Sequence, residues 1–291
     1  MSATPHAAGT PAVSLVIGSG SVKCAAAIGV VKALAEEGIA VDRVVGCSAG
    51  AIFAALVALG YSAQECMDAT RRLWTQELTA KRNNRGMLSA MAPRLFGFRA
   101  ESFGLRDDRL LNKALHAFFG ERRIEDAQIP LHITATDFAD GELVDLDRGS
   151  IADAIRASVA LPFAFPPVRI GDKLLVDGHL ADPLPVSVAI KHSARVIIAV
   201  GFESAYQERI ASAGRFAFQL SAIMSNNLLK SRFSFHSIAH HSEVIAIIPE
   251  FRQRRRLYDT DKVPYIVEEG EACARAQIPY LRDLLAADRP A

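Results

Sequence analysis

The chain has 291 residues, and its 33 Lys and Arg residues nearly balance its 32 Asp and Glu residues, which gives a formal net charge of +1. Half of the residues are apolar and 22% are charged, which excludes an intrinsically disordered chain and a small disulfide-dense scaffold. A dedicated nucleic-acid binder needs a basic surplus to neutralise phosphates, and the near-neutral balance therefore predicts no nucleic-acid partner.

The N-terminus and the cysteines indicate a cytoplasmic protein. Residues 1–12 have neither a basic start nor an apolar core, so we expect a disordered tail and not a signal peptide. The longest near-apolar stretch, residues 49–60, is too short to span a bilayer. No cysteine stands in a CxxC or Cys/His spacing, so we expect buried free thiols and no metal or other cofactor at Cys24, Cys47, Cys66 and Cys273.

The first 77 residues alternate between short apolar runs and helical periodicity. Ser62 and Glu65 form a capping-box pattern, which predicts that a helix begins there and runs to about Glu77. The other expected elements in this part are a strand over 13–17, a helix over 25–37, a strand at 44–45 and a helix over 49–59. Such alternation favours a three-layer α/β/α fold, in which helices cover both faces of a mostly parallel sheet.

Residues 78–108 break this pattern, because basic residues alternate there with Met, Leu and Phe. We interpret the stretch as a flap, since long irregular segments in compact domains are commonly functional. Regular elements are expected again at 109–119 (helix), 131–135 (strand), 140–141 (hairpin-like turn), 151–159 (helix), 174–176, 196–200 and 244–248 (strands), with a long helical stretch before the last strand and a final helix over 266–285. No repeat or linker is visible, so residues 13–291 are expected to form one domain.

The sequence Gly46-Cys47-Ser48-Ala49-Gly50 lies between an apolar strand and an apolar helix. This G-x-S-x-G pattern is typical of a nucleophile elbow, where a serine occupies a tight strand-to-helix turn and small neighbours avoid clashes. The following helix N-terminus would direct N–H groups toward an oxyanion. The same pentapeptide also occurs as a simple turn that begins a helix.

Two further segments carry polar groups at strand ends. Asp177 ends an apolar strand before Gly178, where it is either a base for Ser48 or part of a turn. The loop that follows the first strand, Gly18-Ser-Gly-Ser-Val-Lys23, could present N–H groups to an anion. It does not match a dinucleotide-binding fingerprint, because the third glycine of that motif would fall at Lys23.

The chain resembles the bacterial patatin-like phospholipases over residues 13–250. Three motifs occur in the order seen in that family: the loop at 18–24, the elbow at 46–50 and Leu174-Leu-Val-Asp-Gly-His179. The resemblance implies a patatin-like three-layer fold and a lipid acyl hydrolase with a Ser–Asp dyad. The substrate would be a phospholipid, a lysophospholipid or another acyl ester, and no cofactor is implied.

Carried onto this chain, the resemblance implies that Ser48 attacks the ester carbonyl and that Asp177 accepts its proton and later activates water. The implied oxyanion donors are the N–H groups of Gly18, Ser19, Gly20, Ser21 and Ala49. Gly46, Cys47 and Gly50 would shape the elbow, and Lys23, Gly178 and His179 would be accessory residues.

The chain departs from the family pattern at several positions. Ser19, Ser21 and Cys24 stand where the family usually has glycine, and serine resists a positive φ angle. His179 replaces the usual glycine or alanine, and it is open as an extra base, as a residue that blocks the cleft, or as a simple loop residue. These departures leave a weakly active or inactive lipid- or acyl-binding relative as an alternative.

Two enzyme alternatives also remain open. An α/β-hydrolase would use a histidine late in the chain, for which His236, His240 and His241 are candidates. An acyl-carrier-protein acyltransferase usually has a histidine before its serine, where this chain has Cys47.

The basic and apolar stretch at 78–106 indicates peripheral contact with the inner membrane surface, and a second basic patch consists of Arg252, Arg254, Arg255 and Arg256. The sequence does not indicate an oligomeric state.

Overall fold

The computed structural model describes residues 13–75, 77–78, 81–204, 206, 209–239, 242–251 and 260–287. The tail expected at residues 1–12 and the basic patch at 252–256 lie outside the described residues. His240 and His241 also lie outside them, as does the side chain of His236.

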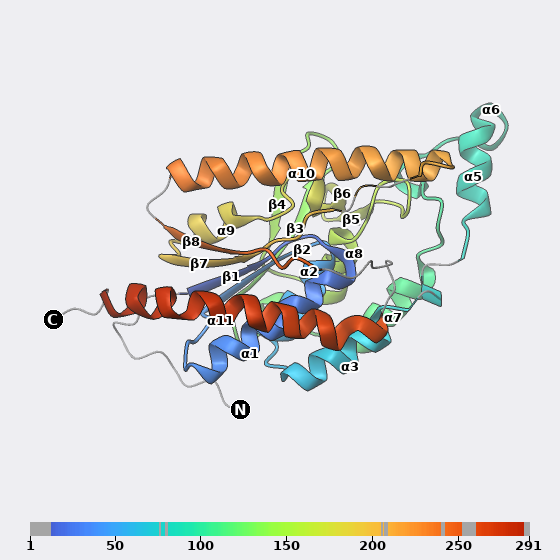
Figure 1. The fold of residues 1–291 in the computed structure, drawn as a ribbon. Coiled ribbons are helices and arrows are strands. Elements are labelled where there is room, and N and C mark those ends of the chain that lie inside the picture. The colour runs from blue at the N-terminus through green and yellow to red at the C-terminus, as the bar shows by residue number, and fades with distance from the viewer. Residues whose placement is uncertain are drawn as a thin grey trace.

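A mixed sheet forms the centre of the molecule (Figure 1). Its parallel part has the order β3-β2-β1-β7-β8, and its antiparallel part consists of β4, β5 and β6. The strands are β1 (Val13–Ile17), β2 (Arg43–Cys47), β3 (Leu131–Asp137), β4 (Leu143–Leu146), β5 (Val168–Ile170), β6 (Lys173–Asp177), β7 (Val196–Val200) and β8 (Glu243–Ile247). The apolar runs of β1 and β7 are fully buried, as expected for central parallel strands covered on both faces.

Helices cover both faces of the sheet, so the expected three-layer fold is confirmed (Figure 1). One layer packs into the main core and contains α1 (Ala26–Glu36), α2 (Ala49–Ala58), α3 (Ala63–Leu73), α7 (Arg109–Phe119), α8 (Ile151–Ser158) and α11 (Val263–Ala287). The other layer contains α9 (Val186–Lys191) and α10 (Ala213–Ala239), which pack on the opposite face. No helix among the described residues is both long enough and apolar enough to cross a membrane.

Several elements differ from the expectation. A short 3-10 helix, Ser21–Ala25, precedes α1, and the capping box at Ser62 opens a helix that ends at Leu73. The strands β4 and β5 and the helix α9 were not predicted, because three to six residues are too few to show a hydrophobic period. Residues 81–108 contain α5 (Asn84–Met91), α6 (Pro93–Phe96) and a 3-10 turn at Ala100–Ser102.

Strand β3 determines which strand ends meet. Its first half pairs with β2 in parallel, up to the pair Cys47 and Thr134, and its second half pairs with β6 antiparallel, beginning at Ala135 and Asp177. Because β4 pairs with residues in both halves of β3, it must occupy the other edge of that strand. The carboxyl ends of β2 and β6 therefore meet head to head along one edge of β3.

Candidate active site

Ser48 lies at the junction of β2 and α2 with φ 54° and ψ −127°, a backbone conformation that L-residues rarely adopt. A Cβ atom on Gly46 would lie 2.6 Å from the Cα atom of Ala51, and one on Gly50 would lie 2.4 Å from the carbonyl oxygen of Ile17. Both glycines of the pentapeptide are therefore required by the close packing of α2 against β1 and β2. Strain of this kind is typical of functional turns.

The head-to-head strand ends bring Ser48 and Asp177 into contact across 129 residues of sequence. The Ser48 hydroxyl donates to Asp177 Oδ2 over 2.8 Å, and the Asp177 side chain is buried with 2% of the residue exposed. The main chain of Asp177 is held on both sides, since its N–H donates to Ala160 O and Thr136 Oγ1 donates to its carbonyl. The carboxylate is therefore fixed in position beside the hydroxyl.

His179 contacts the other oxygen of the same carboxylate. Its backbone N–H donates to Asp177 Oδ1 over 3.1 Å, and its imidazole Nδ1 lies 3.1 Å from the same oxygen. The other ring nitrogen, Nε2, lies 3.1 Å from Ser221 Oγ on α10. Burial by itself lowers the pKa of His179, but the adjacent Asp177 carboxylate raises this pKa by more, so the net pKa lies above the ordinary value. A continuous chain of polar contacts thus runs from Ser48 through Asp177 and His179 to Ser221.

The loop after β1 offers fewer oxyanion donors than the sequence indicated. The N–H group of Gly18 donates to Val200 O, and that of Ser19 donates to Pro183 O, so both are engaged in holding the loop. This corrects the expected donor set at Gly18 and Ser19. The roles expected for Gly20, Ser21 and Ala49 stay predictions. Ser21 has φ 58°, so serine does adopt a positive φ at this former glycine position.

Ser158, at the end of α8, contacts the elbow, although no role was predicted for it. Its hydroxyl accepts the N–H group of Ser48 over 2.8 Å and donates to Thr134 O over 2.6 Å. It therefore anchors the strained backbone of the elbow to β3. The signal for it was the Ala157-Ser158 pair at a helix end, which is too common to identify a function.

The accessory residues and cysteines support the site from outside. Lys23 Nζ donates to Glu203 O, so it ties the loop after β1 to the loop after β7. Burial raises the pKa of the Cys24 and Cys47 thiols, which hydrogen-bond to backbone carbonyls and are inert as nucleophiles. The expected burial is confirmed at Cys24, Cys47 and Cys66, whereas Cys273 is only half-buried.

A second buried carboxylate, Asp182, follows the same strand. Its Oδ1 accepts the N–H group of Leu184, and its Oδ2 has no hydrogen-bond partner among the described residues. Burial raises the pKa of Asp182 to about 6. The adjacent Pro183 carbonyl is the acceptor that fixes Ser19, so this loop supports the loop after β1.

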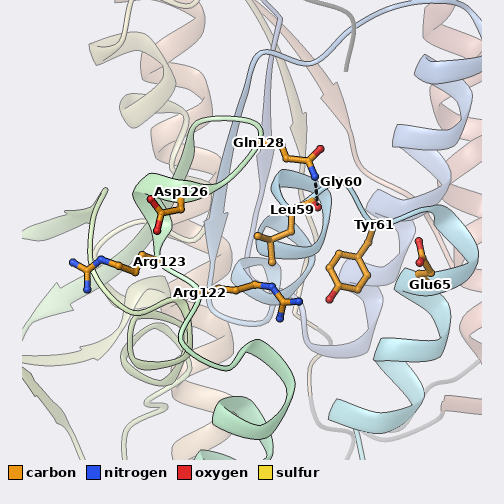
Figure 2. Close-up of a pocket in the computed structure, with 8 residues that line it drawn as sticks. All are labelled: Leu59, Gly60, Tyr61, Glu65, Arg122, Arg123, Asp126 and Gln128. Carbon is orange, nitrogen blue, oxygen red and sulfur yellow. Dashed lines mark hydrogen bonds between the residues drawn. The ribbon is translucent and has the colours of Figure 1, made fainter. Parts of the chain in front are cut away.

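A surface pocket of about 470 Å³ lies elsewhere, between the end of α2 and the segment after α7 (Figure 2). Its lining shares no residue with the dyad or with the loop after β1. Gln128 closes one side by donating to Leu59 O, and Arg122 donates to the carbonyls of Phe118 and Phe119. These polar groups are satisfied within the protein, so the pocket presents no built ligand site.

Comparisons with known proteins identify the family of this chain. The family model of the patatin-like phospholipases matches residues 15–190, which include Ser48 and Asp177. An uncharacterized NTE family protein of Mycobacterium bovis is 33% identical over 191 residues, which cover 66% of this chain and 49% of that protein. The chain therefore spans about half the length of this relative.

A more distant relative and a solved structure extend the comparison. Patatin-like phospholipase domain-containing protein 6 of Mus musculus is 29% identical over 204 residues, or 69% of this chain and 14% of that protein. The crystal structure of VipD from Legionella pneumophila has the same fold, with a TM-score of 0.52 at 16% identity, covering 94% of this chain and 67% of that chain. With a family model that matches more than half of its length, the chain belongs to the patatin-like phospholipase family.

Proposed function

We propose that this protein is a serine lipid acyl hydrolase in which Ser48 is the nucleophile and Asp177 is the proton acceptor. The observation that supports this proposal most directly is the 2.8 Å contact between Ser48 Oγ and Asp177 Oδ2 at a strained strand-to-helix turn. A hydroxyl held against a buried carboxylate in this way is arranged for nucleophilic attack.

In the first step, Ser48 Oγ bonds to the ester carbonyl carbon while its proton passes to Asp177 Oδ2. The tetrahedral intermediate then collapses, the bond to the alcohol oxygen breaks, and the leaving alcohol takes the proton from Asp177. An acyl ester on Ser48 remains. In the second step, Asp177 accepts a proton from water, the resulting hydroxide attacks the acyl carbon, and the fatty acid leaves as Ser48 recovers its proton.

The negative oxygen of each intermediate needs donors, and Ala49 is the first residue of α2. The N–H groups of a first helical turn have no partner within the helix, and the helix dipole adds a partial positive charge there. We assign the oxyanion site to the N–H of Ala49 together with that of Gly20, and Ser21 stays an expected donor on the family resemblance alone. Loss of one such donor typically lowers the rate by about 10²–10³-fold.

His179 acts in this proposal as a positioning residue and not as the base for Ser48. It contacts Asp177 Oδ1, whereas the hydroxyl contacts Oδ2, so the carboxylate stands between serine and histidine. In a Ser-His-Asp triad the histidine stands between the serine and the acid, and this order is therefore not the one formed by His179. The three late histidines weighed for a triad have side chains outside the described residues.

The substrate class proposed is a phospholipid, a lysophospholipid or a related acyl ester, and the proposed setting is a cytoplasmic, single-domain protein at a membrane surface. The segment 81–108 supports this reading, because α5 and α6 project from the body of the molecule (Figure 1) and carry exposed apolar side chains. Met91 and Leu95 are each 81% exposed. Arg85, Arg94 and Arg99 lie on the same segment, and a mixture of basic and apolar groups suits a lipid interface.

This segment is also connected to the dyad. Leu105 and Arg106 donate backbone hydrogen bonds to the carbonyls of Phe163 and Ala164, and the ring of Phe103 contacts those of Phe98 and Phe163. The loop that holds Phe163 follows the helix that ends at Ser158. We therefore propose that 81–108 is a flap whose contact with lipid is transmitted to the elbow through this loop.

The dyad is tested by labelling the full chain with a fluorophosphonate and locating the adduct by mass spectrometry. We expect an adduct at Ser48, none in Ser48→Ala, and hydrolysis of lysophospholipid or short-chain esters by the wild type only. Absence of both labelling and turnover in folded wild-type protein would instead support a binding protein. Alanine variants of the late histidines distinguish a triad, because a triad enzyme would lose nearly all activity in one of them.

The membrane contact is tested by sedimentation with vesicles of phosphatidylcholine and phosphatidylglycerol. We expect Leu95→Asp to reduce binding relative to the wild type, and we expect added salt to weaken binding by screening the arginines. Tyr280→Asp on α11 places the same charge at an exposed side chain outside the flap and serves as the control. Equal binding by the two variants would contradict a role for the flap.

A further inference from the structure

A second cluster of polar side chains lies on β3, away from the dyad. His132 on β3, Asp145 on β4 and His192 at the end of α9 converge so that their ligand atoms all lie within 4.8 Å of one another. Nδ1 of His132 lies 2.9 Å from Asp145 Oδ1, and Nε2 of His192 lies 3.4 Å from Asp145 Oδ2. The two imidazole rings are 4.3 Å apart between centroids.

The cluster is not explained by the dyad. His132 pairs with Val45, whereas the elbow lies beyond Cys47 at the other end of the β2–β3 pairing. No sequence pattern indicates this cluster, because the separations of 13 and 47 residues match no metal-ligand spacing. It assembles only when β4 folds back on β3 and α9 packs over the sheet.

We propose that His132, Asp145 and His192 form a site for a zinc ion. Two imidazole nitrogens and one carboxylate oxygen are a donor set that zinc prefers, and water commonly completes four-coordination in sites with three protein ligands. Bond lengths of about 2.0–2.1 Å at a tetrahedral ion place neighbouring ligand atoms about 3.3 Å apart. The distances of 2.9 Å from His132 Nδ1 to Asp145 Oδ1 and of 3.4 Å from His192 Nε2 to Asp145 Oδ2 lie on either side of that separation, so the carboxylate faces one imidazole with each of its two oxygens.

The surroundings of the cluster suit an ion. The side chains of His132 and Asp145 are 6% and 15% exposed, which shields the ligands, whereas that of His192 is 30% exposed and leaves an entry path. Arg43 Nη1 donates to the carbonyl of His192 over 3.1 Å and so fixes the backbone of this ligand. A bound ion would join three elements, β3, β4 and the end of α9, and would therefore stabilise the fold independently of the proposed hydrolase activity.

The proposal is tested by isothermal titration of the chelator-treated full chain with zinc chloride. We expect one ion per chain and a rise in Tm with zinc concentration, because a ligand that binds only the folded state stabilises it. His192→Ala and Asp145→Asn should each lose more than about 100-fold in affinity, since even loss of an outer-shell partner costs about 10–100-fold. The cobalt-loaded wild type should show the visible absorption of a tetrahedral centre.

His116→Ala is the matched control, because His116 forms an exposed pair with Asp153 on the surface. Circular dichroism before titration establishes that each variant is folded. We expect His192→Ala to fold, because His192 is a partly exposed residue at a helix end. The proposal is overturned if the wild type binds no zinc, if the His192 and Asp145 variants bind it as the wild type does, or if the His116 variant loses as much affinity as they do.

Discussion

Two buried carboxylates at the end of β6 have opposite surroundings. Asp177 and Asp182 are 2% and 1% exposed, yet the oxygens of Asp177 contact a hydroxyl, an N–H group and an imidazole, whereas Oδ2 of Asp182 has no partner among the described residues. Burial raises the pKa of Asp182 to about 6. The two carboxylates are equally buried, so the difference between them lies in what each oxygen contacts.

Asp145, which is only partly buried, provides a third environment for a carboxylate. Each of its oxygens faces one imidazole, and neither faces a hydroxyl. Both Asp145 and Asp177 contact histidine, but only Asp177 has a serine hydroxyl on its second oxygen. The same residue types thus stand in two different arrangements, and the five predictions below test whether these arrangements serve the two proposed functions.

The largest effect is expected for Asp177→Asn. The amide cannot accept the Ser48 proton, so kcat/KM for ester hydrolysis should fall by about 10²–10⁴-fold, the range typical of a lost general base. The side chain has the same shape, so the fold should persist by circular dichroism. Asp153→Asn, which changes a surface carboxylate that also contacts a histidine, is the control. Full turnover by Asp177→Asn would rule out the dyad.

Asp182→Asn should stabilise the protein at neutral pH. The folded-state pKa of about 6 lies above the unfolded value of 3.8, so ionised Asp182 disfavours the folded state above about pH 6. This penalty, on the order of 3 kcal/mol from the constant of 1.36 kcal/mol per pKa unit, shrinks as the pH falls and is absent below about pH 4. Urea unfolding at two pH values measures it, and an equal or lower stability of the variant at neutral pH would contradict the expected sign.

Asp145→Asn should destabilise the protein even when a chelator is present. The variant replaces a charged acceptor between two imidazoles by an amide, and a buried hydrogen-bond group left unpaired costs about 1–3 kcal/mol. Asp147→Asn is the control, because this nearby side chain is 45% exposed and surface changes of this kind usually stay within about 0.5 kcal/mol. Indistinguishable denaturation midpoints for the two variants would show that the cluster has no structural role.

The smallest effect is expected for His179→Gln. Below its raised pKa, protonated His179 attracts the Asp177 carboxylate and weakens the pull of that carboxylate on the Ser48 proton. Wild-type kcat/KM should therefore increase as the pH rises through the His179 pKa, which lies above 6.5. The increase should be about tenfold for each 1.36 kcal/mol of interaction between protonated His179 and Asp177, and the glutamine variant should lack this increase. A similar increase of kcat/KM with pH in both proteins would assign the titration to another group.

The same histidine has a predictable effect on stability. Because its folded-state pKa is raised, its stabilising contribution is fully present below the unfolded value of about 6.5 and is lost as the pH rises through the folded value. His179→Gln should therefore cost more stability at acidic than at alkaline pH. His116→Gln, at an exposed histidine beside a carboxylate, provides the comparison in the same denaturation series.

The local elements around the site could be predicted from short stretches of the chain. The apolar run at Val13–Ile17, the capping box at Ser62 and the close contact of Gly46 with Ala51 depend on the propensities and sterics of residues near in sequence, and the structure has a strand, a helix start and a strained turn there. These features could be predicted because the interactions behind them act over a few residues.

Tertiary structure alone decided which of the distant residues meet. The register of β3 joins Ser48 to Asp177, the anchoring role of Ser158 depends on where α8 ends, and the engagement of Gly18 and Ser19 depends on carbonyls of β7 and of the loop after β6. The cluster of His132, Asp145 and His192 likewise forms only when three elements pack. Such contacts are fixed by strand pairing and by packing across the sheet, to which no short stretch of sequence corresponds.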